Sequence, residues 1–136
     1  MGVSLAGTVP AGANIGVVPI SVLIVDDDAT FRQLAERLLV AAGLNVISQA
    51  DSAGAGMAAA RAIRPDAILL DVMLPDGDGV TLAGELTALP WEPSVLLTSS
   101  SADAAAREEI DGSGAVGFVP KSDLPGVPLE RLLGRA

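Results

Sequence analysis

The sequence predicts an α/β protein: a doubly wound, five-stranded parallel sheet with helices on both faces. Five short apolar runs alternate along the chain with segments of helical periodicity, and most of these runs end at a polar residue. Apolar runs without polar alternation are typical of parallel strands that are buried on both faces. In open sheets of this kind, ligands bind in a crevice outside the carboxyl ends of the strands.

The five predicted strands are short. The run at 21–25 reads SVLIV and stops at three aspartates, and the run at 66–70 reads DAILL and stops at Asp71. Right-handed crossovers between parallel strands leave few topologies for such an order. We expect strands at 21–25, 45–49, 66–70, 94–97 and 115–119.

The predicted helices lie between and after the strands. Apolar residues recur at spacings of three and four from Phe31 to Ala42, which indicates one helical face. Either Asp28 caps this helix, or Thr30 does so and forms a capping box with Gln33. Prolines end the second and third helices. We expect helices at 31–42, 53–64, 80–89, 102–110 and 129–133.

The 136 residues fit a single domain, and no internal repeat is visible. Residues 1–19 are rich in small residues, and we interpret them as a flexible leader before a domain at 20–136. This leader lacks a basic segment and is interrupted by glycine and proline, which disfavours a signal peptide. No apolar run reaches the length of a transmembrane helix, so we expect a cytoplasmic protein.

Charge and composition exclude several classes of function. The formal net charge is −9, with 17 acidic and 8 basic side chains, which disfavours binding to nucleic acid or to an anionic membrane. The chain has no cysteine and no histidine. Disulfides, a Cys/His zinc site, a histidine base and a histidine phosphocarrier are therefore excluded.

Polar side chains gather where the predicted strands end. Three aspartates, Asp26–Asp28, follow the first strand, and Asp71 follows the third. Thr98 follows the fourth strand, and Lys121, the only lysine, comes just after the fifth. Taken singly, such an aspartate is usually a turn former or a helix cap. Together and in this order they indicate one crevice that holds carboxylates, a hydroxyl and an ammonium.

This grouping is suited to phosphoryl transfer. Carboxylates that lie close together repel each other, and a hard divalent cation such as Mg²⁺ relieves the repulsion. Asp71 can then act as the nucleophile toward a phosphoryl group and form an acyl phosphate. Lys121 would neutralise the phosphoryl oxygens in the transition state, and Thr98 could afterwards bond one of them.

Four stretches of the sequence resemble the receiver domains of bacterial response regulators. They read VLIVDDDATFRQLAERLL, PDAILLDVMLPDGDG, VLLTSS and GFVPKS, and the resemblance spans nearly the whole chain from residue 21. The resemblance implies a sheet of flavodoxin-like order and a signalling domain rather than an enzyme. It also implies a phosphoryl group received from a sensor histidine kinase or a phosphotransfer protein, and a downstream partner protein that the sequence does not identify.

The resemblance implies a role for each residue of the site. Asp71 is the phosphoacceptor and a ligand of Mg²⁺. Asp27 binds this cofactor directly, Asp26 binds it through water, and Met73 offers its backbone carbonyl.

Three further residues carry the switch that the resemblance implies. Lys121 pairs with the phosphoryl group on Asp71, Thr98 moves toward that group, and Phe118 fills the space that Thr98 leaves. The surface of the fourth helix, fifth strand and fifth helix then changes, and a partner reads it.

Two features depart from the family pattern. Ser122 follows Lys121 where many members have proline, so a cis or a trans peptide is left open there. Pro125 and Pro128 lie in a segment that is often helical, so the last helix is expected to be short. The chain is either a stand-alone receiver or a receiver without its output domain.

Two other functions are open at this point. Asp26 and Asp28 form a D-x-D motif, which aspartyl-phosphate phosphohydrolases use as nucleophile and acid, although such enzymes usually have a longer chain. Phosphate would label Asp26 in that class and Asp71 in a receiver. A pseudo-receiver would bind partners without phosphorylation, but it is disfavoured because every residue of the site is present.

Overall fold

The computed structural model describes residues 18–134. The predicted leader at 1–19 lies almost entirely outside these residues, and so does the end of the predicted domain at 135–136. Within the described part, no helix is long and apolar enough to cross a bilayer. All its peptide bonds are trans, including the bond between Lys121 and Ser122.

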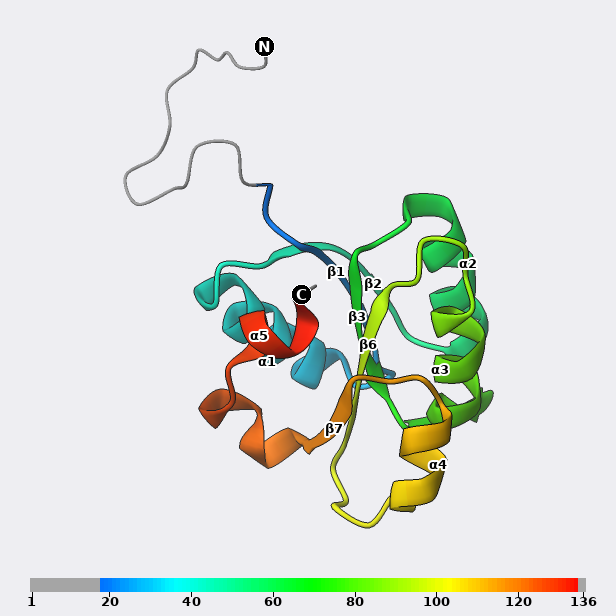
Figure 1. Ribbon diagram of the computed structural model, residues 1–136. Helices are drawn as coiled ribbons and strands as arrows, with labels where there is room; N and C mark the ends of the chain where they lie inside the picture. Colours follow the sequence, from blue (N-terminus) through cyan, green and yellow to red (C-terminus); the bar gives the residue numbers. More distant parts are fainter. Residues whose placement is uncertain (1–17, 135–136) are drawn as a thin grey trace, which may run out of the picture.

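Five parallel strands form the central sheet in the order β2-β1-β3-β6-β7. The chain therefore winds from β1 outward in one direction and then in the other, and helices lie on both sides of the sheet (Figure 1). This arrangement confirms the predicted doubly wound, flavodoxin-like fold. The strands are Ser21–Val25 (β1), Asn45–Ala50 (β2), Ala67–Asp71 (β3), Ser94–Ser99 (β6) and Gly117–Pro120 (β7).

The helices form two layers. Helices α1 and α5 pack on one face of the sheet, and α2, α3 and α4 pack on the other (Figure 1). Both faces of a parallel sheet are apolar and must be buried, so each face is covered by a layer of helices. The helices are Ala29–Ala41 (α1), Ala53–Ile63 (α2), Gly79–Thr87 (α3), Arg107–Gly112 (α4) and Leu129–Leu133 (α5).

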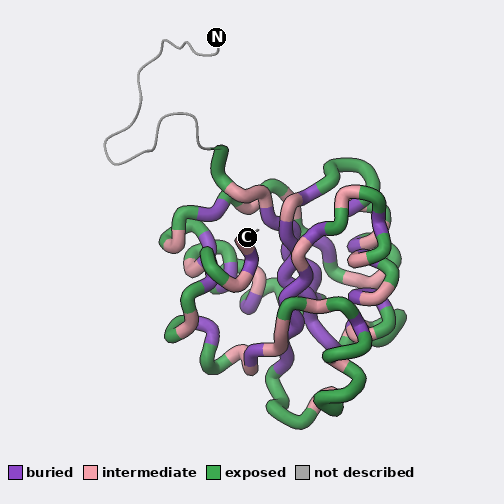
Figure 2. Tube along the Cα trace, viewed as in Figure 1, coloured by how far each residue is buried: buried purple, intermediate pink, exposed green. Residues whose placement is uncertain are grey.

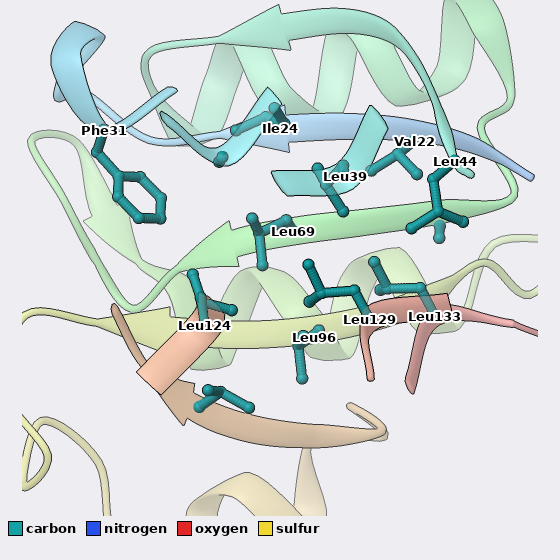
Figure 3. Packing of buried hydrophobic residues seen from close by; sticks show 13 residues of the cluster. Val22, Ile24, Phe31, Leu39, Leu44, Leu69, Leu96, Leu124, Leu129 and Leu133 are labelled. Carbon is teal, nitrogen blue, oxygen red and sulfur yellow. The ribbon is translucent and has the colours of Figure 1, made fainter. Parts of the chain in front are cut away.

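The sheet contributes alternate side chains to two hydrophobic cores. Val22, Ile24 and Leu69 belong to the core under α1 and α5 (Figure 3), whereas Leu23 and Ile68 belong to the core under α2 and α3. Figure 2 shows the buried strands as a continuous purple band through the centre of the molecule. Burial on both faces is the physical reason for the apolar runs in the sequence.

The fourth helix is shorter than predicted. Helix α4 begins at Arg107 because the Glu109 carboxylate accepts a hydrogen bond from the Ala106 amide at 3.0 Å and so caps the helix at this point. The segment 102–106 is a loop, so the first part of the helix predicted at 102–110 was wrong. The fifth strand begins at Gly117, two residues later than predicted.

Two short elements were not predicted from the sequence. Met73–Leu74 (β4) and Gly77–Asp78 (β5) form a small antiparallel hairpin in the loop after Asp71. The segment Lys121–Gly126 (η1) is a 3₁₀-helix that includes Pro125 near its end. A 3₁₀-helix of this length tolerates a proline more easily than the interior of an α-helix, because few hydrogen bonds are lost.

Gly79, the first residue of α3, has no room for a side chain. A Cβ atom there would lie 2.7 Å from Cα of Val72 and would collide with the carbonyl oxygen of Asp71. We expect Gly79→Ala to lower the free energy of unfolding by about 2–4 kcal/mol, because backbone atoms rather than a flexible side chain must move.

Urea unfolding followed by the fluorescence of Trp91 measures this change. Gly112→Ala in α4 is the matched control, because a Cβ atom there meets nothing within 4 Å and alanine favours the helix. If Gly79→Ala were as stable as the wild type and the control, this would contradict the close packing of α3 against the backbone of Asp71.

Candidate functional site

Strand pairing brings the predicted site residues to one edge of the sheet. Asp71 is the last residue of β3 and lies opposite Thr98 of β6. Asp26 directly follows β1, and Lys121 directly follows β7. Because these strands are parallel, all four residues lie at the carboxyl ends, where the sequence places them.

Three carboxylates form an acidic cluster at this edge: those of Asp26, Asp27 and Asp71. Each residue offers an oxygen, and these oxygens lie within 4.8 Å of one another. Asp26 and Asp71 are buried, whereas Asp27 is exposed. At such distances the negative charges oppose each other, and burial prevents water from screening them fully.

Asp28 has a structural role outside the acidic cluster. Its carboxylate caps α1 by accepting hydrogen bonds from the amides of Thr30 at 3.0 Å and Phe31 at 3.3 Å. Of the two caps that the sequence allows, Asp28 is therefore the one that forms. The consequence is that Asp28 fixes the start of α1.

Asp26 has different partners for its two carboxylate oxygens. Oδ1 accepts a hydrogen bond from the Asp28 amide at 2.8 Å, and the Arg32 guanidinium donates to the backbone carbonyl of Asp26 at 2.7 Å. Oδ2 lies 2.8 Å from Nζ of Lys121 but forms no hydrogen bond of good geometry. This buried oxygen is therefore held by an ion pair with Lys121 rather than by a hydrogen bond.

Lys121 supplies positive charge to the acidic cluster. Its Nζ lies 2.8 Å from Oδ2 of Asp26 and 3.7 Å from Oδ2 of Asp71. The Lys121 side chain is 17 % exposed, so its ammonium is partly removed from water. A single ammonium does not balance three carboxylates, and the site therefore keeps a net negative charge when all three are ionised.

The surroundings of Asp71 perturb the ionisation of its carboxyl group. Burial, and then the charge of Asp26, raise the pKa of Asp71 from 3.8 to about 6. The Met73 amide, which donates to Oδ1 of Asp71 at 3.2 Å, and the Lys121 ammonium oppose this rise. At neutral pH the carboxyl group is mostly ionised, but at an energetic cost.

The acidic cluster fits a hard divalent cation. All its donor atoms are oxygens, they lie within 4.8 Å of one another, and the net charge is negative when all three carboxylates are ionised. Met73 lies in β4, two residues after Asp71, and its side chain is largely exposed. The metal-binding role of its carbonyl stays a prediction.

The Thr98 hydroxyl is directed at β7. Thr98 is fully buried, and its Oγ1 donates a hydrogen bond to the carbonyl of Val119 at 2.7 Å. Phe118, the residue before Val119, is half-buried and lines a hollow that also includes Ile110 of α4. The two residues predicted to switch therefore lie on adjacent strands, and their signalling role stays a prediction.

Asp76 was not singled out from the sequence. Its carboxylate accepts hydrogen bonds from the amides of Gly54 at 3.0 Å and Ala53 at 2.7 Å, in the first turn of α2. These bonds lower the pKa of Asp76 and fasten the loop after Asp71 to that helix. An acidic residue in a turn is too common to have revealed this contact, because the two amides lie 22 and 23 residues earlier in the chain.

We expect Asp71→Asn to stabilise the protein at neutral pH when divalent cations are absent. The folded protein retains the Asp71 proton up to about pH 6, whereas the unfolded chain loses it near 3.8. The free energy of unfolding of the wild type therefore falls as pH rises through this interval. Asparagine does not ionise, so the variant keeps this stability. At pH values above 6 we expect its free energy of unfolding to exceed that of the wild type by on the order of 1–3 kcal/mol.

Urea unfolding in EDTA, at about pH 7.5 and about pH 4, measures the difference. The gain should shrink toward the lower pH, and Asp111→Asn on the surface of α4 should show none. An Asp71→Asn variant no more stable than the wild type at the higher pH would contradict the raised pKa.

One protein family and several known proteins are similar in sequence to this chain. The sequence pattern of the response regulator receiver domain matches residues 22–127. The DNA-binding transcriptional activator DevR/DosR of Mycobacterium tuberculosis is 38% identical over 114 residues, which make up 82% of this chain and 52% of that protein. A protein-glutamate methylesterase/protein-glutamine glutaminase of Anaeromyxobacter dehalogenans is 36% identical over 111 residues, or 80% of this chain and 32% of that protein. The chain thus spans about a third to a half of the length of these relatives.

Solved structures agree with the sequence match. The signal receiver domain of NarL from Mycobacterium tuberculosis gives a TM-score of 0.74 at 29% identity, with 86% of this chain and 98% of that chain covered. The response regulator domain of Thermotoga maritima CheB gives a TM-score of 0.70 at 25% identity, with 85% and 92% covered. The chain therefore belongs to the receiver-domain family of the response regulators of two-component systems.

Proposed function

We propose that this receiver domain accepts a phosphoryl group on Asp71 from a phosphohistidine of a sensor histidine kinase or a phosphotransfer protein. The observation that carries the proposal is the place of the Asp71 carboxylate, which lies within the acidic cluster and 3.7 Å from Nζ of Lys121. A carboxylate that attacks a phosphoryl group needs positive charge beside it, because the incoming oxygens are anionic. The chain contains no histidine, so the donor is another molecule or another part of a longer protein.

In the proposed reaction, an oxygen of Asp71 attacks phosphorus as the bond from phosphorus to the imidazole nitrogen breaks. The electron pair of that bond stays on the nitrogen, and the products are an acyl phosphate and a histidine. The pKa of about 6 leaves Asp71 mostly ionised at neutral pH and more basic than an ordinary aspartate. Lys121 turns from Asp26 toward the phosphoryl oxygens and neutralises part of their charge.

Mg²⁺ is the cofactor that we propose for this site. Asp27 and Asp71 would bind it directly, Asp26 through water, and Met73 through its carbonyl. Bound there, the cation supplies charge neutralisation between the carboxylates and the phosphoryl oxygens. The exposure of Asp27 supports this assignment, because a ligand at the mouth of the site can meet a hydrated ion.

Thr98 and Phe118 would pass on the signal. The Thr98 hydroxyl, which now donates to Val119, would turn to a phosphoryl oxygen on Asp71, and Phe118 would leave the hollow beside α4 for the vacated space. This change alters the surface that α4, β7 and the following segment form, and a downstream protein reads it. The half-burial of Phe118 supports the proposal, because a half-buried ring has room on one side.

The two alternative functions have less support. A phosphohydrolase would use Asp26 as the nucleophile and Asp28 as the acid, but the Asp28 carboxylate is engaged in capping α1. A pseudo-receiver would lack part of the site, whereas Asp71, Thr98 and Lys121 all lie at the edge of the sheet. We therefore propose a signalling domain that assists its own phosphorylation rather than an enzyme with a separate substrate.

The partners that we propose are proteins. A net charge of −9 disfavours binding of this domain to nucleic acid or to an anionic membrane. Sensor kinases take their phosphoryl group from ATP, so we place the domain in the cytoplasm. DevR/DosR is nearly twice as long as the segment it shares with this chain, and an output domain in a longer natural protein would determine the downstream partner.

Phosphorylation should add a single phosphoryl group to the wild type and none to Asp71→Asn. Incubation with Mg²⁺ and a small phosphodonor such as phosphoramidate, followed by intact-mass spectrometry, tests this expectation. Asp28→Asn is the matched control, because asparagine still caps α1 and a receiver does not need that carboxylate, whereas a phosphohydrolase does. A label on Asp26, or no label with several donors, would overturn the proposal.

Loss of one carboxylate from the acidic cluster should weaken the binding of Mg²⁺. We expect Asp27→Asn to raise the dissociation constant by about tenfold or more, because one anionic ligand is lost. Isothermal titration calorimetry measures this constant, and Asp111→Asn, outside the cluster, should leave it unchanged. Equal affinities of Asp27→Asn and the wild type would contradict the assignment of Asp27 as a ligand.

A further inference from the structure

The Lys121 ammonium has a neighbour that is not a carboxylate. Its Nζ lies 4.3 Å from the centroid of the Phe31 ring, over the ring face. A cation within about 6 Å of an aromatic centroid is attracted by the negative face of the ring, and more strongly where water is excluded. Lys121 is only 17 % exposed, so this attraction acts on a partly dehydrated ammonium.

The fold fixes the position of the Phe31 ring independently of Lys121. Phe31 lies in the first turn of α1, where its amide donates to the capping carboxylate of Asp28 at 3.3 Å. The residue is 7% exposed and packs in the core under α1 and α5. Figure 3 shows the ring directed from α1 toward the carboxyl ends of β1 and β3. It is therefore a rigid surface at the edge of the site.

The three neighbours of the Lys121 ammonium differ in how they respond to chemistry at the site. Asp26, at 2.8 Å, and Asp71, at 3.7 Å, attract it through carboxylate charges, which a bound cation would partly neutralise. The Phe31 ring is neutral, and its attraction does not depend on those charges. When the carboxylate charges are neutralised, the attraction of the ring for the ammonium is unchanged.

We propose that Phe31 is a positioning residue for phosphoryl transfer. It acts through Lys121, by holding the ammonium beside Asp71 after the pull of the carboxylates has weakened. The contact with Phe31 raises the fraction of molecules in which the Lys121 ammonium lies beside Asp71 and can meet the phosphoryl oxygens. This inference rests on the proposed function, because it assumes that Lys121 neutralises those oxygens during transfer to Asp71.

Fluorinated phenylalanines at position 31 test this role with little change in shape. One, two or three fluorine atoms on the ring progressively weaken its negative face. We expect the rate of phosphorylation by phosphoramidate, measured by intact mass, to fall stepwise to about a third to a tenth of the wild-type rate. The urea midpoint should stay nearly constant, because the packing of the ring is kept.

Leu39→Val is the matched control for damage to the core. Leu39 is fully buried in the same core and on the same helix as Phe31, but it is not among the neighbours of the ammonium. It should lower the urea midpoint while leaving the phosphorylation rate unchanged. Phe31→Leu should lower both.

A readout without phosphorylation comes from a double-mutant cycle in urea unfolding with Phe31→Leu and Lys121→Gln. The unfolding equilibrium constants should show a coupling of about two- to fivefold between the two changes.

The possible outcomes separate the two proposals. A wild type that is phosphorylated, with a rate that does not change along the fluorine series, would overturn the positioning role and leave the phosphoacceptor assignment intact. An additive double-mutant cycle would also count against the contact. A wild type that takes up no phosphoryl group would overturn the proposed function, and the positioning role with it.

Discussion

Mutual repulsion among three carboxylates is the constraint on which the site depends. Asp26 directly follows β1, and Asp71 is the last residue of the adjacent strand β3. Because these buried strands are paired, the two charges cannot move apart. Burial and then the charge of Asp26 raise the pKa of Asp71, and the Met73 amide and Lys121 offset only part of this rise. The folding energy of the sheet thus maintains a site that is ready to attract a cation.

Close backbone packing holds the loop after Asp71 from two sides. Gly79 lies against the carbonyl of Asp71, and its amide donates to the carbonyl of Val72 at 2.7 Å. On the other side, Asp76 ties the same loop to the first turn of α2. The segment that contains Met73 is therefore supported by both α2 and α3, and its backbone is well placed to keep a fixed geometry near the acidic cluster.

The fold and the gathering of the site could be predicted because both depend on patterns that are local in sequence. A buried parallel strand has no polar face, and its carboxyl end shares an edge with its neighbours, which places Asp26, Asp71 and Lys121 together. Contacts that join distant segments could not be predicted in this way. The bond from Asp76 to α2 is such a contact, and the direction of the Thr98 hydroxyl depends on a choice between acceptors on adjacent strands.

A hydroxyl carries one proton, so Thr98 can donate to one acceptor at a time. In this structure that acceptor is the carbonyl of Val119, and a turn toward Asp71 would require this 2.7 Å bond to break. Thr98 is fully buried, and an orientation between the two acceptors would leave the hydroxyl unsatisfied, at a cost of about 1–3 kcal/mol. If Thr98 turns as we propose, it would have two stable orientations and no graded series between them. The strength of an output read from this edge of the sheet would be the fraction of molecules that have turned, not how far each one has turned.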